Sequence, residues 1–350
     1  MYGYVNYMEG IAYYHLSLSH DMEENLTTAI AKYEHALSVY SSQKYPLQYA
    51  AVQNAMGNAY TSLSETRDKE NNLLKAIECH TRSLAIYTPD KNPIEYAATQ
   101  NNLGNAFRAL SEVRDREENL TKSIQAYEQA FRVYDSGNMS YQCALVNNDL
   151  AAAYTSLSGV RDSEVNLDKA ITLCKQALNE FTIEMYPVEY AKVQSNLGDA
   201  YRGLFAVTHK EDDLATAIYA YEQALRIRTI ELYPRDHATT EVNLATAYSA
   251  MAQIRDKELY LSKAISACLD AVLVYTIDKE PLTYALIQNN LGNDYASLSD
   301  VTETKANLTK AISAYEEALQ VFTEDKYPES YAMVMNNLTS TQNRLQSLGQ

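Results

Sequence analysis

The sequence has few cysteines and histidines, the residues on which redox chemistry and many metal sites depend, and it contains no tryptophan. Its four cysteines lie far apart and form no Cys-x-x-Cys pair, so neither a zinc site nor a disulfide framework is expected. The six histidines show no His-Glu-x-x-His spacing, and the ten glycines form neither a dinucleotide-binding nor a phosphate-binding loop. No cysteine or serine can be paired with a histidine base as an activated nucleophile. We therefore expect a chain that is not an enzyme and that uses no metal or cofactor.

Long apolar runs and a net positive charge are also missing. No stretch approaches the roughly 18 consecutive apolar residues of a membrane span. The first residues, MYGYVNYMEG, have neither the basic nor the apolar region of a secretory signal. The formal net charge of −16 argues against nucleic acid as a partner. These absences predict a cytoplasmic protein that contacts neither nucleic acid nor a membrane.

What the sequence has instead is a repeat of 47 residues without an insertion or deletion. The same phase of this repeat holds Tyr2, Tyr49, Tyr96, Cys143, Tyr190, His237, Tyr284 and Tyr331. Six of the seven prolines share another phase, at which Ser140 is the exception. Such regularity predicts one array over residues 1–350. Its repeats 1 to 7 start near residues 2, 49, 96, 143, 190, 237 and 284, and a terminal helix covers 328–347.

Each repeat has the pattern of two helices. In repeat 3, Tyr96, Leu103, Phe107 and Leu110 lie on one face of a helix that we expect to end near Ser111. The column of prolines opens these first helices, because proline is tolerated at the first helical position. Asp115 and Glu118 are expected to form a capping box for the second helix, which should run to about Tyr134. One hairpin cannot bury both apolar stripes alone, so stacked hairpins, an all-α solenoid, are predicted.

These motifs resemble the tetratricopeptide repeat (TPR) family over the entire chain. The family pattern Leu-Gly-x-x-Tyr followed by Ala-x-x-x-Phe-x-x-Ala corresponds to Leu103-Gly104…Phe107 with Ser123…Tyr127…Ala130, and to Leu291-Gly292…Tyr295 with Ala311…Tyr315…Ala318. The period of 47 residues is longer than the 34 residues of the family. In this long repeat the chain is similar to the TPR arrays associated with CHAT proteases and signalling NTPases. The resemblance implies a right-handed superhelix whose first helices line a concave, peptide-binding surface.

The first helices carry an unusual set of asparagines and glycines. The glycine column, Gly104 among it, faces a column of small residues and is expected to let two helices approach closely. With 100° per residue, Asn101 and Asn105 lie about 160° from Leu103, on the face away from the helix's own core. Combined with the orientation that the resemblance implies, this face gives these candidate peptide-binding residues: Asn54, Asn58, Asn101, Asn105, Arg108, Asn148, Lys192, Asp199, Arg202, Asn289 and Asn293.

The asparagines allow two interpretations. Their amides could bind a ligand's backbone, because each offers a donor and an acceptor, or they could form a ladder that holds neighbouring helices in register. A leucine recurs in every repeat, as Leu120 in repeat 3, and Asn119 and its equivalents, which directly precede this leucine, are interpreted as structural. The Arg-Asp pairs of the inter-helix turn, such as Arg114-Asp115, are interpreted in the same way. The favoured function is a non-catalytic scaffold with an asparagine-rich groove for a protein or peptide. The alternative is the sensor or regulatory array of a larger effector system, a protease or an NTPase.

The amino-terminal helix breaks the pattern. Its groove-facing residues are Tyr4, Tyr7, Ile11 and Tyr14, and Glu9 stands where other repeats have an apolar residue. Solenoids usually need a polar cap, and an exposed aromatic patch commonly marks a contact surface. We therefore predict that these four residues form a docking patch for self-association or for an effector, with a frayed helix as the alternative.

Overall fold

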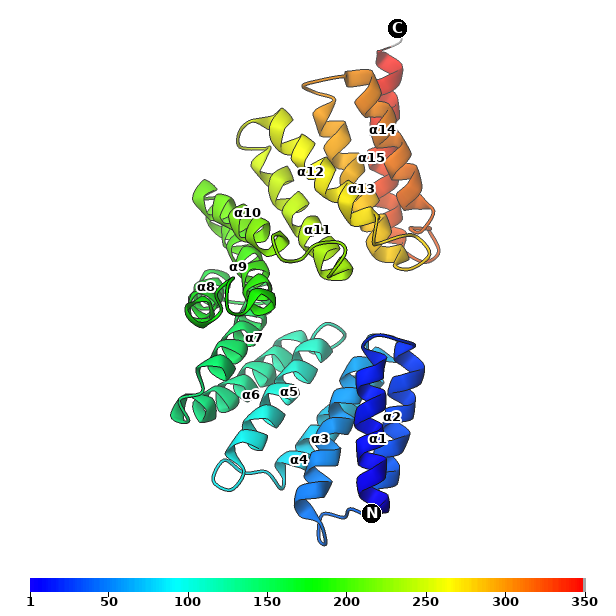
Figure 1. Cartoon of the computed structure of the whole chain (residues 1–350). Helices are drawn as coiled ribbons and strands as arrows, with labels where there is room; N and C mark the ends of the chain where they lie inside the picture. Colours follow the sequence, from blue (N-terminus) through cyan, green and yellow to red (C-terminus); the bar gives the residue numbers. More distant parts are fainter. Residues whose placement is uncertain (349–350) are drawn as a thin grey trace. The chain divides into compact units, whose positions relative to one another are not determined.

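The computed structural model describes residues 1–348, which form fifteen α-helices and no strand (Figure 1). They fall into two compact units, unit 1 over Met1–Glu180 and unit 2 from Phe181 onward. Unit 1 contains α1 (Tyr2–Ser17), α2 (Met22–Leu37), α3 (Pro46–Leu63), α4 (Lys69–Leu84), α5 (Pro93–Leu110), α6 (Arg116–Ser136), α7 (Ser140–Ser158) and α8 (Ser163–Glu180). Unit 2 contains α9 (Pro187–Thr208), α10 (Glu211–Leu225), α11 (Pro234–Met251), α12 (Lys257–Val272), α13 (Pro281–Leu298), α14 (Thr304–Leu319) and α15 (Pro328–Ser347).

Each unit is built from helix hairpins packed in chain order. Within a unit every helix packs against the preceding and the following one, and the first helices of adjacent repeats also touch, as α3 and α5 do. The predicted all-α repeat architecture is confirmed, with helices beginning at the column prolines, for example at Pro187 and Pro234. Along residues 1–348 no helix is both long and apolar enough to cross a membrane.

The turn between the two helices of a repeat differs from the predicted capping box. Asp115 is the N-cap residue of α6, but its backbone is left-handed with φ 45°, and its side chain caps no backbone group of the described chain. Glu118 instead pairs with Lys122 at 2.6 Å. Asp suits this position because a short polar side chain tolerates the left-handed region better than most residues. The equivalents of Asp115 in repeats 1, 2, 4 and 6 have the same conformation.

The turn is closed by asparagine and tied to the neighbouring repeat by arginine. Asn119 is buried, and its Nδ2 donates a hydrogen bond of 2.8 Å to the carbonyl oxygen of Arg114. The same bond forms at four equivalent positions, Asn25, Asn72, Asn166 and Asn307. Arg114 reaches back to Glu70 of the preceding repeat at 2.8 Å. The structural interpretation of this asparagine column is therefore confirmed.

The core repeats with the same period. The leucines equivalent to Leu120 are 0–1% exposed, and the small residues equivalent to Ser123 are fully buried. Ser123 Oγ donates to the carbonyl oxygen of Gly104 at 2.8 Å, which brings α5 and α6 into close contact. Burying one such leucine contributes about 1.5–3 kcal/mol.

The glycine column makes room for a ring of the second helix. A Cβ atom at Gly104 would lie 2.6 Å from two ring carbons of Tyr127, and comparable clashes of 2.4–2.6 Å would occur at Gly10, Gly57, Gly198 and Gly292. In repeats 4 and 6 the ring is replaced by Cys174 or Cys268, and there the glycine is replaced by Ala151 or Ala245. The glycines are therefore fixed by packing against a ring.

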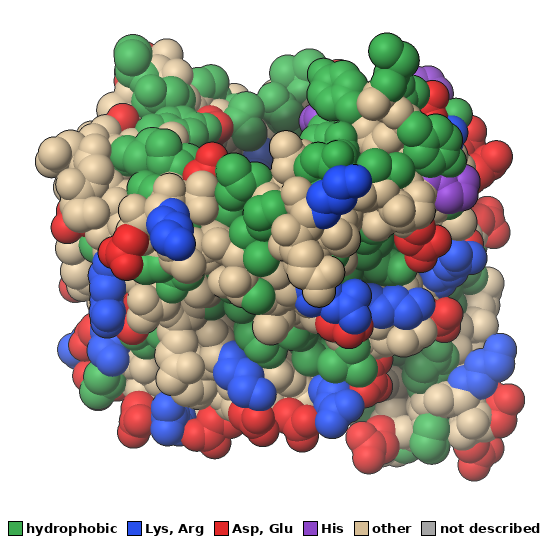
Figure 2. All heavy atoms as spheres, turned by 90° about the horizontal axis from the view of Figure 1, so that it is seen from below, with side chains coloured by type: hydrophobic (Ala, Val, Ile, Leu, Met, Phe, Trp, Pro, Cys, Tyr) green, Lys and Arg blue, Asp and Glu red, His purple; other side chains and the backbone are tan. Residues whose placement is uncertain are grey.

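Charged side chains lie on the surface. Figure 2 shows acidic side chains with basic ones interspersed along one edge of the face that it displays, and hydrophobic side chains gathered towards the opposite edge. The Arg–Glu pairs between repeats have half-exposed partners, such as Arg67 with Glu23 and Arg161 with Glu117. Exposed pairs of this kind are worth about 0.2–1 kcal/mol each, so the core supplies most of the stability.

Candidate functional site

The rings that lie over the glycines also hold the candidate groove residues. Tyr127 Oη donates to Asn105 Oδ1 at 2.7 Å, and Tyr315 Oη donates to Asn293 Oδ1 at 2.8 Å. In repeat 2 the ring is His80, whose Nδ1 lies 3.0 Å from Asn54 Oδ1. Burial lowers the pKa of His80 to about 3, so this ring is neutral. The side chains at these positions are thus oriented by the second helix of their own repeat.

A second set of contacts links adjacent first helices. Asn102 Nδ2 on α5 donates to Asn54 Oδ1 on α3 at 3.2 Å, and Asn101 Nδ2 donates to Asp149 Oδ2 on α7 at 3.3 Å. These bonds between neighbouring helices are those that the ladder interpretation expects.

The expectation that the candidate groove residues lie on an open face is wrong for two asparagines at the repeat position of Asn101. Asn148 is 2% exposed and Asn289 is 6% exposed, so neither side chain lies on an open groove. The physical reason is that the first helices of adjacent repeats touch, so a residue opposite its own core can be covered by the neighbouring helix. The angle of a residue around its own helix axis carries no information about how the neighbouring helix covers that residue.

In repeat 5 the position of Asn105 holds a charged residue, Asp199, and the position of Arg108 holds Arg202. In repeat 5, Tyr221 Oη donates to Asp199 Oδ1 at 2.7 Å, and Arg202 Nε donates to Tyr221 Oη at 3.3 Å. Burial raises the pKa of Asp199, although these two neighbours favour its charged form. In repeat 3 the corresponding arginine is Arg108, whose Nε is buried without a hydrogen-bond partner among residues 1–348. The three groups of repeat 5 therefore form a compact network inside that repeat.

Lys192 also belongs to unit 2. Its side chain is exposed on α9, and with Arg228 and Asp236 it borders a cavity of about 240 Å³ in unit 2.

A larger cleft lies on the first-helix face of unit 1, with a volume of about 480 Å³. We call it the N-terminal cleft, and its lining consists of Tyr7, Ile11, Tyr14, His15, Tyr33, Ala51, Asn54, Ala55, Asn58, Tyr87, Ile94, Glu95 and Ala98. It brings three residues of the docking patch together with two residues of the candidate groove, which the sequence treats as separate sites. Tyr4, the fourth patch residue, is 60% exposed and lies outside the cleft.

The walls of the N-terminal cleft are mostly aromatic and apolar. The rings of Tyr7 and Tyr33 lie 6.1 Å apart, tilted by 48°. Burial raises the pKa of Tyr7 and that of Tyr87, the latter to about 12, so both hydroxyls remain protonated donors at neutral pH. Concave sites with apolar walls and a few polar groups are typical of ligand binding. The sequence prediction omits Tyr33, Tyr87 and Ile94, although the aromatic column that contains Tyr87 is visible in most repeats.

A smaller and more polar cleft lies in unit 2, between α13 and α15. Its volume is about 350 Å³, and its lining includes Asn293, Asp300, Asn337 and Arg344. Arg344 pairs with Asp300 at 2.6 Å and also donates to Ser299 Oγ at 2.8 Å. Its charged groups are therefore paired with each other, in contrast to the apolar walls of the N-terminal cleft.

Comparison with known proteins gives a fold but no sequence family. No family model matches the chain, and no curated protein matches its sequence. Among solved structures, a Rap protein complexed with Competence and Sporulation Factor is 13% identical, with a TM-score of 0.50 over 99% of each chain. The C-terminal part of a TPR repeat-containing protein from Cytophaga hutchinsonii is 15% identical, with a TM-score of 0.46 over 93% of this chain and 99% of that chain. The chain has a TPR-like repeat fold, and at these identities the likeness concerns the fold alone.

Proposed function

We propose that this TPR-like array is a non-catalytic binding scaffold and that its N-terminal cleft holds an extended segment of a partner protein or peptide. The observation that carries the proposal is the composition of the cleft, in which aromatic walls stand beside the amides of Asn54 and Asn58. Apolar side chains of a ligand would enter between Tyr7, Ile11 and Tyr14. Amide groups beside them can bond to a peptide backbone whatever its side chains, because an amide donates and accepts.

The fold is compatible with this role. A Rap protein, to which the chain is similar in fold, is known in complex with the Competence and Sporulation Factor. The cleft also has the size and the apolar character of ordinary ligand sites, which occupy about 300–1,000 Å³. A single acidic residue, Glu95, belongs to its lining, so its walls favour apolar anchors over a strongly charged ligand.

The test blocks the cleft without removing core contacts. Ala51 and Ala98 both line it, and their equivalent in repeat 5 is Lys192, so a lysine at this helical position is already accepted by the array. We expect A51K/A98K to fold like the wild type and to lose binding of peptides selected on the wild type from a phage-displayed random library. The matched control is Leu145→Lys, at the same position of repeat 4 and outside the cleft, which should retain binding.

Two results would overturn the proposal. The library could yield no peptide that binds the wild type above background. Alternatively, the selected peptides could bind A51K/A98K as tightly as they bind Leu145→Lys, measured by fluorescence anisotropy with folded protein verified by circular dichroism.

A further inference from the structure

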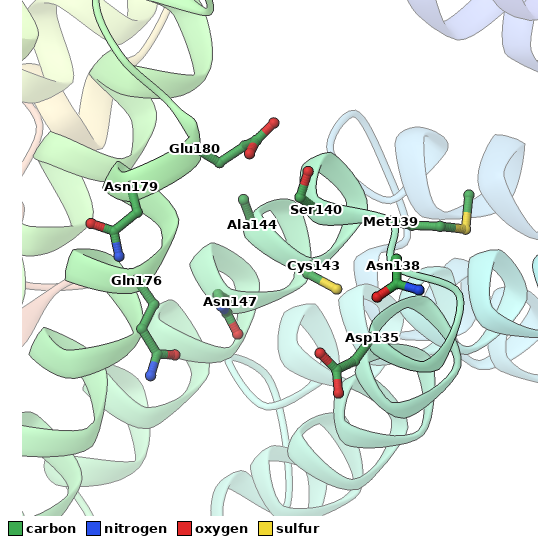
Figure 3. Close-up of a pocket in the computed structure, with 10 residues that line it drawn as sticks. All are labelled: Asp135, Asn138, Met139, Ser140, Cys143, Ala144, Asn147, Gln176, Asn179 and Glu180. Atoms are coloured by element: carbon green, nitrogen blue, oxygen red, sulfur yellow. The ribbon is translucent and has the colours of Figure 1, made fainter.

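A separate cavity of about 390 Å³ lies in repeat 4, between the ends of α6 and α8 and over the first turns of α7 (Figure 3). Its lining comprises Asp135, Asn138, Met139, Ser140, Cys143, Ala144, Asn147, Gln176, Asn179 and Glu180. Figure 3 shows Asn147 between Gln176 of α8 and Asp135 of α6, with its side chain directed into the space that these residues border. This cavity shares no residue with the N-terminal cleft.

Two residues of α7 that border this cavity have smaller side chains than their equivalents in most other repeats. Cys143 occupies the phase at which six other positions of the array have tyrosine. Asn147 occupies a phase that is glutamine in repeats 2, 3, 5 and 7. Both replacements remove side-chain volume from the same face of α7, one helical turn apart.

Other repeats show where the tyrosine ring goes. In repeat 3, Gln100 Nε2 donates to Tyr96 Oη at 3.0 Å, and Gln100 is the equivalent of Asn147. In repeat 7, Tyr284 Oη donates to Glu317 Oε2 at 3.0 Å, and Glu317 is the equivalent of Gln176. The hydroxyl therefore meets the two positions that border the cavity of repeat 4. The cavity is the place of a tyrosine ring that this repeat does not supply.

One polar atom at the cavity has no hydrogen-bond partner within the described chain. Asn147 is 6% exposed, and its Oδ1 is buried and accepts no hydrogen bond from any residue that the structure describes. Leaving a buried acceptor unsatisfied is unfavourable, so a hydroxyl donor at this point would be favourable. Asp135 and Glu180 add negative charge at the border, which favours a cation beside the hydroxyl and disfavours an anion.

We propose that this cavity binds a tyrosine side chain of a partner peptide in which lysine or arginine flanks the tyrosine. The phenol ring takes the place that Tyr96 and Tyr284 occupy in their own repeats. Its hydroxyl donates to Asn147 Oδ1, and the flanking cation lies near Asp135 and Glu180. The inference rests on the cavity beside α7 and does not depend on the function proposed for the N-terminal cleft.

The binding can be followed through Cys143 itself. This cysteine is partly exposed, whereas Cys79, Cys174 and Cys268 are buried, so a thiol reagent such as DTNB should modify Cys143 first in the folded protein. Burial raises the pKa of the Cys143 thiol, so the reaction will be slow enough to measure. The peptide acetyl-Lys-Tyr-Lys-amide should slow it with saturable dependence on concentration. Tyramine, a small phenolic amine, should protect more weakly, because it offers one cation where the peptide offers two.

Two peptide variants and two protein variants make the test specific. Acetyl-Lys-Phe-Lys-amide, which has no hydroxyl, should require about five-fold more peptide for equal protection, as expected for one lost hydrogen bond of about 1 kcal/mol. The phosphotyrosine version should bind more weakly still, because the carboxylates of Asp135 and Glu180 repel it. Cys143→Tyr, which restores the residue of the other repeats, should fill the cavity and lose peptide binding in isothermal titration calorimetry. Cys143→Ser should fold and bind like the wild type.

The outcomes divide clearly. Protection by the tyrosine peptide, loss in Cys143→Tyr and retention in Cys143→Ser would support the proposal. Equal protection by the tyrosine and phenylalanine peptides would overturn it, because the hydroxyl would then play no part. Equal binding by Cys143→Tyr and the wild type would also overturn it, provided that circular dichroism shows the variant to be folded. Tighter binding of tyramine than of the peptide would replace a partner peptide by a small-molecule ligand and overturn the choice of occupant.

Discussion

The pairing of a first-helix glycine with a second-helix ring can be tested by exchanging one pair for another that the chain already contains. Repeat 3 pairs Gly104 with Tyr127, whereas repeat 4 pairs Ala151 with Cys174. Converting the first pair into the second requires G104A and Y127C. If packing fixes the pair, the two changes should compensate each other, so the double variant should be more stable than the sum of the single effects predicts.

The magnitudes follow from the contacts. In Gly104→Ala the new Cβ would lie 2.6 Å from two carbons of a ring that is fully buried. The overpacking cost of about 1–3 kcal/mol should exceed the gain of about 1 kcal/mol from replacing glycine in a helix. Tyr127→Cys alone should cost about 3–5 kcal/mol, because it removes a buried ring and the hydroxyl that bonds to Asn105. In the double variant the clash disappears and the alanine gain remains, so the coupling should be about 2 kcal/mol in favour of the double variant.

The assay is a double-mutant cycle measured by urea unfolding with far-ultraviolet circular dichroism. Gly159→Ala serves as a control, because a Cβ there would lie 3.5 Å from its nearest neighbour and the backbone is already helical. It should be neutral or stabilising by about 0.4–1 kcal/mol. Additive effects of G104A and Y127C within about 0.5 kcal/mol, or stabilisation by G104A comparable to that of the control, would refute the packing argument.

Three further predictions concern single positions. Burial raises the pKa of Asp294 to about 7, so the folded state keeps a proton that the unfolded state releases near pH 4. Stability should therefore fall between about pH 4 and 7 by about 4 kcal/mol at most. Asp294→Ala, which restores the alanine of repeats 1 to 6, should remove that part of the slope in urea melts, and an unchanged slope would contradict it. Asn119→Ala should lower the free energy of unfolding by about 1–3 kcal/mol, since it leaves the carbonyl of Arg114 without its bond, whereas no loss in thermal melts would argue against the turn bond. Limited proteolysis should first cut near Gly137-Asn138, where proline is replaced and Asn138 has φ 53°, and an earlier cut at another junction would count against this.

The helices could be predicted from the sequence because their boundaries depend on local signals. Pro93 begins α5, and α5 ends at Leu110, one residue before the expected end at Ser111. The hydrogen bonds of the turn could not be predicted in the same way. Asp115 and Glu118 satisfy the capping pattern, yet the left-handed backbone of Asp115 removes the geometry that a side-chain cap needs.

The candidate sites depended on contacts between repeats, which the period alone does not reveal. The angle of Asn148 on its own helix predicts an open face, but that side chain is buried. The glycine column was predicted to face small residues, and the ring of the second helix that also lies against it was not predicted. The signal for that ring is present in the sequence, because Ala151 accompanies Cys174 and Ala245 accompanies Cys268. The cavity at Cys143 was readable in part, because a cysteine interrupts a tyrosine column. The volume of that cavity depends on how α6, α7 and α8 pack together, which the repeat period does not determine.

The bonds between adjacent repeats have a consequence for how such a chain changes over generations. Arg67 reaches Glu23 and Arg114 reaches Glu70, each 44 residues back, so these two junctions present the same donor to the same acceptor. A recombination that joins equivalent codons of two repeats would add or delete one hairpin and leave matching surfaces at the new junction. The gene can therefore lengthen or shorten its product by whole hairpins, and the substitutions that distinguish one copy, such as Cys143 with Asn147, travel with that copy as a unit.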